Sequence, residues 1–254
     1  MTSASWQPNP THSPSSQAPT TALVTGANKG IGRETAERLA ALGWTVWLGA
    51  RDVERGKAAA ADLSAGGGDV RFVQLDVTSD ASVDAAAATI SAESGSLDVL
   101  VNNVGVSGPR VPPADTTAAD FLACFGVNLL GPVRVTYAFL PLLRRSADPR
   151  VVMVSSGMGS FGVTTDPTRL ESTLHGLVYQ SSKAALNMVT TQYARAVPEV
   201  RFNAVDPGYT ATDLNGHNGI QSIAEGAVAV GASATSPADG PTGGFSDRFG
   251  AVAW

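Results

Sequence analysis

The sequence predicts an α/β protein: a single domain with a doubly wound sheet of seven mainly parallel strands and helices on both faces. Short apolar runs alternate with helical patterns from residue 21 to the C-terminus, and no linker-like break interrupts them. The runs are apolar throughout, as in strands buried on both faces. Parallel strands need crossover helices, which cover both faces of the sheet. A chain of 254 residues is close to the largest that one core usually organises.

The first unit has the clearest pattern. Residues 21–26 (TALVTG) form a short apolar run that ends in Thr-Gly, which favours a buried strand. Residues 30–42 then place their apolar side chains on one helical face, and Gly43 supplies a helix stop. Residues 45–50 (TVWLGA) predict the second strand.

The same alternation continues along the chain. It predicts helices over residues 52–64, 80–94, 115–145 and 177–196, and strands over residues 70–76, 97–103, 150–156, 201–205 and 244–247. Ligands in such sheets bind at the carboxyl ends of the strands. Polar or small residues that mark those ends are Gly26, Ala50, Asp76, Asn103, Ser156 and Pro207.

Composition narrows the function classes. Residues 1–20 are rich in Ser, Thr and Pro and lack a signal-peptide pattern, so we expect a disordered tail ahead of a domain over residues 21–254. A net charge of −5 gives no basis for nucleic-acid binding, and no apolar run is long enough to predict a membrane span. Cys124 is the only cysteine, so an intrachain disulfide is impossible. These features predict a soluble, cytoplasmic protein.

The first strand-to-helix turn carries Gly26, Gly30 and Gly32 in a Gly-x-x-x-Gly-x-Gly spacing. Glycines allow a tight turn, and the helix N-terminus offers amide groups to a pyrophosphate. No Lys-Ser/Thr pair follows, which disfavours a nucleoside-triphosphate loop. The pattern predicts a dinucleotide site, with ordinary turn chemistry as the alternative.

The second strand ends in Ala50-Arg51, where an NAD site would carry an Asp or Glu for the ribose 2′-hydroxyl. Arg51 and Lys29 are suited to a 2′-phosphate, so the pattern favours NADPH over NADH. Two solvated surface charges are the alternative. Asp76 ends the third strand, where it either accepts from an adenine amino group or simply terminates the strand.

Tyr179 and Lys183 are four residues apart and therefore share a helical face. A tyrosine has a pKa near 10, and lowering it by about three units takes roughly 4 kcal/mol, much of which a nearby cation can supply. Tyr-x-x-x-Lys alone is a weak pattern. Ser156 at a strand end and Asn128 on the preceding long helix are candidate polar partners of this pair.

Together these motifs resemble the classical short-chain dehydrogenase/reductase family, and especially its carbonyl-reductase-like members, from about residue 20 to 254. They are TGANKGIG, GARD, LDVT, VNNVG, VNLLG, VSSG, YQSSK, VDPG and PTGGF, in the family's order. The resemblance implies a Rossmann-type fold with the catalytic residues Asn128, Ser156, Tyr179 and Lys183. It implies that Tyr179 protonates the nascent alkoxide, Ser156 and not Ser155 orients the carbonyl, Lys183 holds the nicotinamide ribose and lowers the tyrosine pKa, and Asn128 anchors a relay water.

The resemblance also implies NADP(H) as cofactor, no metal, and a small ketone or aldehyde as substrate, or the alcohol in reverse. The implied cofactor-binding residues are Gly26, Asn28, Lys29, Gly30, Ile31, Gly32, Arg51, Asp76, Val77, Asn103, Tyr179, Lys183, Pro207, Gly208 and Thr210. Two alternatives stay open. One is a non-catalytic NADPH-binding regulator on this fold, and the other is an NAD-dependent alcohol dehydrogenase.

Three features depart from the family pattern or extend it. Val104 stands where the family usually has Ala, which adds bulk beside the cofactor. The interval between Ser156 and Tyr179 is longer than usual, and we expect it to form a specificity loop; such an insertion leaves dimer, tetramer and monomer open. The segment 208–231, rich in Gly and small polar residues, is expected to form a mobile substrate lid.

Overall fold

A computed structural model describes residues 19–109 and 111–254, and within them the predicted doubly wound sheet is confirmed. The strands lie in the order β3-β2-β1-β4-β5-β6-β7-β8. Their bounds are β1 Thr21–Thr25, β2 Thr45–Ala50, β3 Asp69–Gln74, β4 Val99–Asn102, β5 Arg150–Val154, β6 Arg201–Val205, β7 Phe245–Asp247 and β8 Gly250–Ala251. All neighbours pair in parallel except β7 and β8. The described chain therefore has eight strands rather than the seven expected, because the chain turns back after β7 in a two-residue antiparallel strand.

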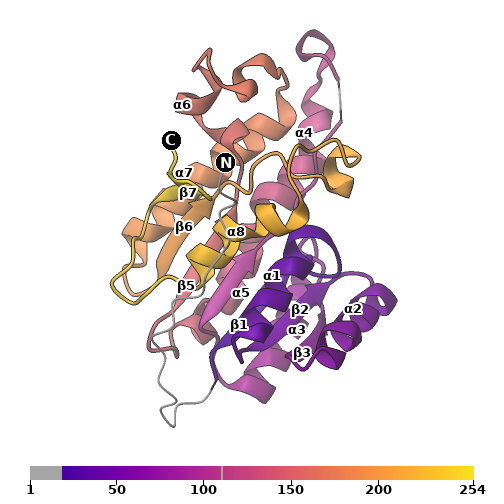
Figure 1. The fold of residues 1–254 in the computed structure, drawn as a ribbon, viewed down its shortest axis with the longest axis vertical. Helices are drawn as coiled ribbons and strands as arrows, with labels where there is room; N and C mark the ends of the chain where they lie inside the picture. Colours follow the sequence, from indigo (N-terminus) through magenta and orange to yellow (C-terminus); the bar gives the residue numbers. More distant parts are fainter. Residues whose placement is uncertain (1–18, 110) are drawn as a thin grey trace.

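Helices cover both faces of the sheet (Figure 1). One face carries α1 (Gly30–Ala41), α2 (Val53–Ala65) and α8 (Ile223–Ala234), and the other carries α3 (Asp80–Ser94), α5 (Gly131–Leu143) and α7 (Val178–Ala196). Alternate residues of β1 point into the two cores: Val24 packs with the first set of helices and Leu23 with the second. Both side chains are fully buried, as expected for a strand that is apolar on both faces.

The strand order reverses between β1 and β4, so the carboxyl ends of these strands open a crevice where ligands bind in this class of sheet. Elements that follow strand ends gather there. They are α4 (Ala118–Phe125), α6 (Phe161–Thr164) and the short turns η1 Pro113–Asp115, η3 Gly157–Gly159, η4 Leu170–Thr173 and η5 Asp213–Asn215. Figure 1 shows α4 and α6 at the same end of the molecule.

The helix expected over residues 115–145 is interrupted. Its observed span, Ala118–Leu143, contains the π-helical turn η2 (Gly126–Leu130) between α4 and α5. The sequence did not predict this turn, because hydrophobic periodicity does not reveal one extra residue in a helical turn. By length and composition alone, Ala118–Leu143 could cross a membrane. This is weak evidence, because core helices of soluble proteins meet the same criteria. Here it packs against α3 and α7.

The segment 208–231 is only partly the lid that we expected. Its first half is a loop fastened by a bridge between Thr210 and Gln221. Its second half belongs to α8, where Gly226, Ala227 and Val230 are buried against the sheet and α1. The small residues there allow close helix packing, so the prediction of a lid was wrong for that half, which is a packed helix. The predicted disordered tail lies, except for its last two residues, outside the described residues.

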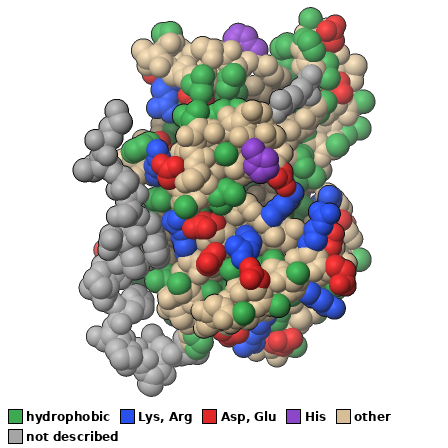
Figure 2. Space-filling view, turned by 45° about the vertical axis from the view of Figure 1, so that its right-hand side comes forward, with side chains coloured by type: hydrophobic (Ala, Val, Ile, Leu, Met, Phe, Trp, Pro, Cys, Tyr) green, Lys and Arg blue, Asp and Glu red, His purple; other side chains and the backbone are tan. Residues whose placement is uncertain are grey.

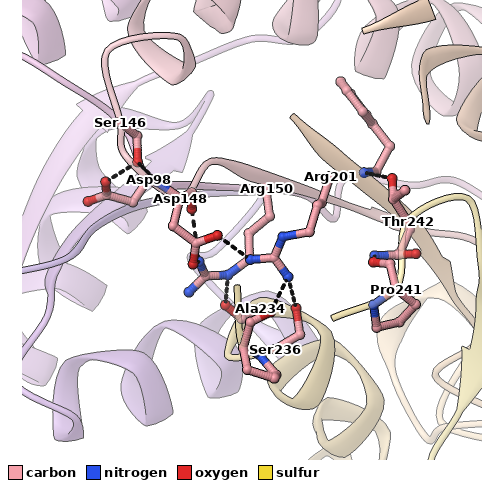
Figure 3. Close-up of polar contacts among 12 residues, drawn as sticks. Asp98, Ser146, Asp148, Arg150, Arg201, Ala234, Ser236, Pro241 and Thr242 are labelled. Atoms are coloured by element: carbon pink, nitrogen blue, oxygen red, sulfur yellow. Dashed lines mark hydrogen bonds and ion pairs between the residues drawn. The ribbon is translucent and has the colours of Figure 1, made fainter. Parts of the chain in front are cut away.

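A buried cluster of charges holds the opposite end of the sheet together (Figure 3). Arg150 and Arg201, at the starts of β5 and β6, both pair with Asp148, at 2.9 Å and 2.5 Å. Arg150 Nε also donates to the carbonyl of Ala234 at 2.5 Å, and Arg201 Nη1 donates to Ser236 Oγ at 2.8 Å. The cluster therefore fixes the C-terminus of α8 to the sheet, away from the strand ends that form the crevice.

Candidate active site

The glycine turn between β1 and α1 is tightly built. Gly26 and Gly30 have φ values of +65° and +59°, which other residues rarely adopt. A Cβ at Gly32 would overlap Asn103 Nδ2, which donates to the carbonyl of Thr25 at 2.9 Å. Asn103, expected beside the cofactor, thus holds the turn in shape. A Cβ at Gly26 would lie 2.8 Å from Val104 Cγ2, so the extra bulk of Val104 packs directly on the turn.

The N-terminus of α1 is open to an anion. Its N-cap residue Lys29 makes no side-chain capping bond, which leaves the first-turn amides without the usual partner. A Cβ at Gly30 would meet only Thr212 Cγ2, at 3.9 Å, so this side of the turn has space. Asn28 and Ile31 flank it and are partly exposed. A pyrophosphate fits these donors.

A surface hollow of about 460 Å³ adjoins the turn. It is lined by Asn28, Lys29, Arg33, Arg55, Ala58, Ala59 and Asp62. Arg33 and Arg55 were missed in the sequence, and helical spacing from Arg51 could not have found Arg55, because Arg51 precedes the N-cap Asp52 and lies outside α2. Acidic residues accompany the cations, since Arg33 pairs with Asp62 and Lys29 with Asp213. Figure 2 likewise shows basic and acidic side chains interleaved on this part of the surface.

Asp76 and Val77, at the end of β3, face different surroundings. Asp76 Oδ1 accepts from the amide and hydroxyl of Thr78 at 2.9 Å and 2.7 Å, and these bonds lower the pKa of Asp76. An ionised carboxylate can accept from an amino group. The Val77 side chain is turned inward instead: it is 5% exposed and packs on Gly131 at the start of α5.

The two serines at the end of β5 have different neighbours. Ser155 is buried, and its Oγ donates to Asn187 Oδ1 at 2.5 Å. Ser156 is partly exposed, and its Oγ lies within hydrogen-bonding reach of the Tyr179 phenol while accepting from the amide of Met158 at 3.2 Å. Of the two hydroxyls, that of Ser156 is the one near the phenol, and the catalytic role expected of Ser156 stays a prediction.

Tyr179 and Lys183 lie one turn apart near the start of α7, as expected. Lys183 Nζ is 5.8 Å from the centroid of the Tyr179 ring and donates to the carbonyl of Val154 at 2.8 Å. Lys183 is 3% exposed, so its charge sits in a nearly dry site. The structure thus brings Ser156, Tyr179 and Lys183 to one place at the end of β5.

The electrostatics of this pair differ from the expectation. Burial raises the pKa of Tyr179 to about 12, and the hydrogen bond with Ser156 opposes this rise only in part. Burial also lowers the pKa of Lys183 to about 8. The net lowering that we expected of the tyrosine pKa is therefore not seen, because burial has the largest effect on Tyr179 and Ser156 is the group that opposes it. The effect of Lys183 on this pKa stays a prediction. Tyr179 is a protonated donor at neutral pH.

The lowered pKa of Lys183 predicts a rise in stability with pH. Between the folded value of about 8 and the ordinary value of 10.5, the unfolded chain binds the proton and the folded chain does not. The free energy of unfolding should therefore increase by about 3 kcal/mol over that interval from this residue alone. Urea unfolding of wild type and Lys183→Met at pH 7 and pH 10 measures it. A difference between the two proteins that is the same at both pH values contradicts the prediction.

Asn128 lies in the π-helical turn and is fully buried. Its Nδ2 donates to the carbonyl of Val106 at 2.9 Å and to Ser182 Oγ at 3.0 Å, while its Oδ1 accepts from the amide of Val106. A Cβ at Gly105 would lie 3.7 Å from both Asn128 Oδ1 and Lys183 Nζ. Asn128 thus anchors the segment after β4 beside Lys183, a role the sequence did not reveal.

The turn after β6 carries Pro207, Gly208 and Thr210. Gly208 is exposed with a φ of +75°, whereas Thr210 is 5% exposed and its hydroxyl donates to the carbonyl of Pro207 at 3.1 Å. Gln221, missed in the sequence, donates to that carbonyl and, at 2.8 Å, to Thr210 Oγ1. The hydroxyl of Thr210 therefore shapes the turn rather than pointing outward.

The long interval between Ser156 and Tyr179 folds into η3, α6 and η4. Ser160 Oγ donates to the carbonyl of Ala253 at 2.6 Å, which ties the C-terminal end to this insertion. In the part of this interval that precedes α7, the side chains of Leu170, Leu174 and Leu177 are 43% to 49% exposed. An insertion at this place, with exposed apolar side chains, is suited to the specificity role that we expected of it.

A doubly wound sheet with a dinucleotide-type glycine turn and a Ser-Tyr-Lys group at the strand ends defines a class of nucleotide-dependent oxidoreductases. The family model described as short chain dehydrogenase matches residues 20–222. The chain belongs to this family.

Individual relatives agree with that membership. (-)-Isopiperitenone reductase of Mentha piperita is 36% identical over 91% of this chain and 97% of its own length. Salutaridine reductase of Papaver somniferum superposes with a TM-score of 0.79 and 31% identity, over 90% of this chain and 99% of that one. An NADPH-bound carbonyl reductase from chicken fatty liver superposes with a TM-score of 0.81 and 28% identity, over 94% of this chain and 100% of that one.

Proposed function

We propose that this chain is an NADP(H)-dependent reductase that converts a ketone or aldehyde carbonyl to an alcohol, or catalyses the reverse reaction. The observation that carries the proposal is the convergence of Ser156, Tyr179 and Lys183 at the end of β5. The glycine turn adds support, because its helix N-terminus has no side-chain cap and so has amides suited to a pyrophosphate. Relatives named as reductases of isopiperitenone and salutaridine support carbonyl reduction. The cytoplasmic location and the oligomeric state stay predictions.

When bound, NADPH would supply the hydride that adds to the carbonyl carbon. As that bond forms, the π electrons of the carbonyl move to oxygen, and Tyr179 Oη gives this oxygen its proton. Ser156 Oγ, within reach of the same phenol, donates to the carbonyl oxygen and orients it. The Tyr179 phenolate then regains a proton from solvent. The raised pKa of Tyr179 keeps its proton in place until the alkoxide develops.

Lys183 is placed to bind rather than to react. Its Nζ retains two donor positions beyond the bond to the Val154 carbonyl, and these suit the hydroxyls of the nicotinamide ribose. Because its pKa is about 8, the ammonium form predominates at neutral pH. Asn128 holds the segment after β4 beside it.

The preference for NADP(H) rests on the cations around the turn. Arg51 directly follows β2, and the residue before it is Ala50, which has no carboxylate. Arg55 and Lys29 line the adjoining hollow. A guanidinium forms paired, charge-assisted bonds with a phosphate. Solved relatives with bound NADPH or NADP support this assignment.

Replacing Arg51 with Asp is expected to lower the ratio of kcat/KM for NADPH to that for NADH by about 10- to 100-fold, the loss of one charge-assisted bond. Steady-state rates with each cofactor and one ketone measure the ratio. Arg71→Asp is the matched control, because Arg71 lies on β3 in an exposed pair with Asp69. If Arg51→Asp improves NADH use without weakening NADPH use, the chain is an NAD-dependent dehydrogenase.

The proposed activity is tested by a screen of ketones, aldehydes and quinones, including menthone and salutaridine, with absorbance at 340 nm and both cofactors. We expect NADPH consumption with at least one carbonyl compound. Tight NADPH binding without turnover on any of them would favour the non-catalytic regulator.

A further inference from the structure

Asp206 is a buried carboxylate that the proposed mechanism does not use. It directly follows β6, before Pro207, and is 6% exposed. Its Oδ1 accepts from the amide of Gly208 at 2.9 Å, and the carboxylate also accepts from the amide of Gly157. Gly157 follows Ser156, so one side chain joins the serine turn to the turn at the nicotinamide end of the expected cofactor site.

Within the part of the chain that the structure describes, no cation forms an ion pair with this carboxylate. A second carboxylate lies close by: a Cβ at Gly157 would be 2.8 Å from Asp206 Oδ2 and 3.3 Å from Glu171 Oε1. Glu171, on η4 of the insertion, has its own partner in Arg169 at 3.4 Å. Leaving an acid without a partner in a dry site costs free energy, so its charge calls for an explanation.

The titratable groups whose charges interact with that of Asp206 come from three elements. Tyr179 and Lys183 lie on α7, Glu171 on η4 and Asp247 on β7. Burial first, and then the charges of Glu171 and Asp247, raise the pKa of Asp206. In turn, the negative charge of Asp206 opposes ionisation of Tyr179 and favours the charged form of Lys183. Both effects favour the protonated pair that carbonyl reduction needs.

A neutral amide oxygen could accept one of the two backbone bonds as well as a carboxylate does. What it could not supply is the charge beside Tyr179 and Lys183. The connection from Asp206 to Ser156 is through a backbone amide, so the carboxylate acts on the reaction through other groups and touches no reacting atom.

Building on the proposed reductase function, we propose that Asp206 is a positioning residue: its carboxylate fastens the Ser156 turn to the Pro207–Gly208 turn and places a negative charge behind Tyr179 and Lys183. Two consequences follow for the pH profile of carbonyl reduction. Protonation of Asp206 lowers kcat/KM at acid pH, and loss of the Lys183 proton lowers it at alkaline pH.

The test compares wild type, Asp206→Asn and Glu171→Gln in the pH dependence of kcat/KM for reduction of one neutral ketone by NADPH. Asp206→Asn should lower kcat/KM at pH 7 by about tenfold, remove the acid limb, and move the alkaline limb down by about one pH unit. Glu171→Gln should move the acid limb to lower pH, because removal of the like charge eases ionisation of Asp206. NADPH binding by fluorescence should persist in both variants.

Two results would overturn the proposal. One is a fall in kcat for Asp206→Asn with both limbs unmoved, which a purely structural role would give. The other is an acid limb that Glu171→Gln leaves in place, and this second variant decides the matter if Asp206→Asn does not fold. Failure of the reductase function itself is recognised separately, since wild type would then reduce no carbonyl compound.

Discussion

Tyr179→Phe is expected to lower kcat for carbonyl reduction by about 10²- to 10⁴-fold, the usual contribution of a positioned general acid. The ring and its packing are retained, and only the hydroxyl beside Ser156 is lost. The Kd for NADPH, measured by fluorescence titration, should stay within about twofold, because Lys183 and the glycine turn are untouched.

Tyr193→Phe is the matched control on the same helix. Tyr193 stacks on Phe202 with ring centroids 4.9 Å apart, on the core side of α7. This variant should keep wild-type kcat. Equal activities for Tyr179→Phe and wild type would remove Tyr179 from the role of proton donor.

Asp148→Ala is expected to lower the free energy of unfolding by about 2–3 kcal/mol, which corresponds to a fall in Tm of roughly 5–10 °C. The substitution leaves Arg150 and Arg201, only 8% and 12% exposed, without their shared carboxylate. The value is below the usual cost of breaking a buried pair because Asp148 itself is 40% exposed and the two arginines keep carbonyl partners.

Thermal unfolding by circular dichroism measures this loss. Glu199→Ala is the control, since its pair with Arg144 is exposed on both sides and should leave Tm near the wild-type value. The NADPH affinity of Asp148→Ala, measured below its Tm, should match wild type because the cluster lies at the opposite end of the sheet. An unchanged Tm would show that water compensates the two arginines.

Features set by short-range patterns were predictable from the sequence. The strand over β1 and the helix α1 were found because apolar runs and helical periodicity are local, and Gly43 ends its helix with a φ of +79° as a stop glycine should. The helix predicted from residue 52 begins there, with Asp52 as its N-cap: the side chain accepts from the amide of Arg55 at 3.0 Å. The spacing of four residues correctly predicted that Tyr179 and Lys183 lie on the same face of one helix.

Features that depend on the surroundings in three dimensions were not predictable. The pKa values of Tyr179 and Lys183 are governed by burial, which the spacing of two residues does not encode. The inward turn of Val77 depends on Gly131, and the pair of Lys29 with Asp213 joins residues far apart in the chain. Such contacts arise only from the complete fold.

The most direct measurement follows the hydride itself. Wild type is supplied with NADPH deuterated at the transferable position and with a ketone that it reduces, and the product alcohol is analysed by mass spectrometry and NMR. We expect one deuterium on the carbinol carbon, with transfer slowed strongly in Tyr179→Phe. An alcohol without deuterium at that carbon, or full transfer in Tyr179→Phe, would contradict the assignment of this site as a carbonyl reductase.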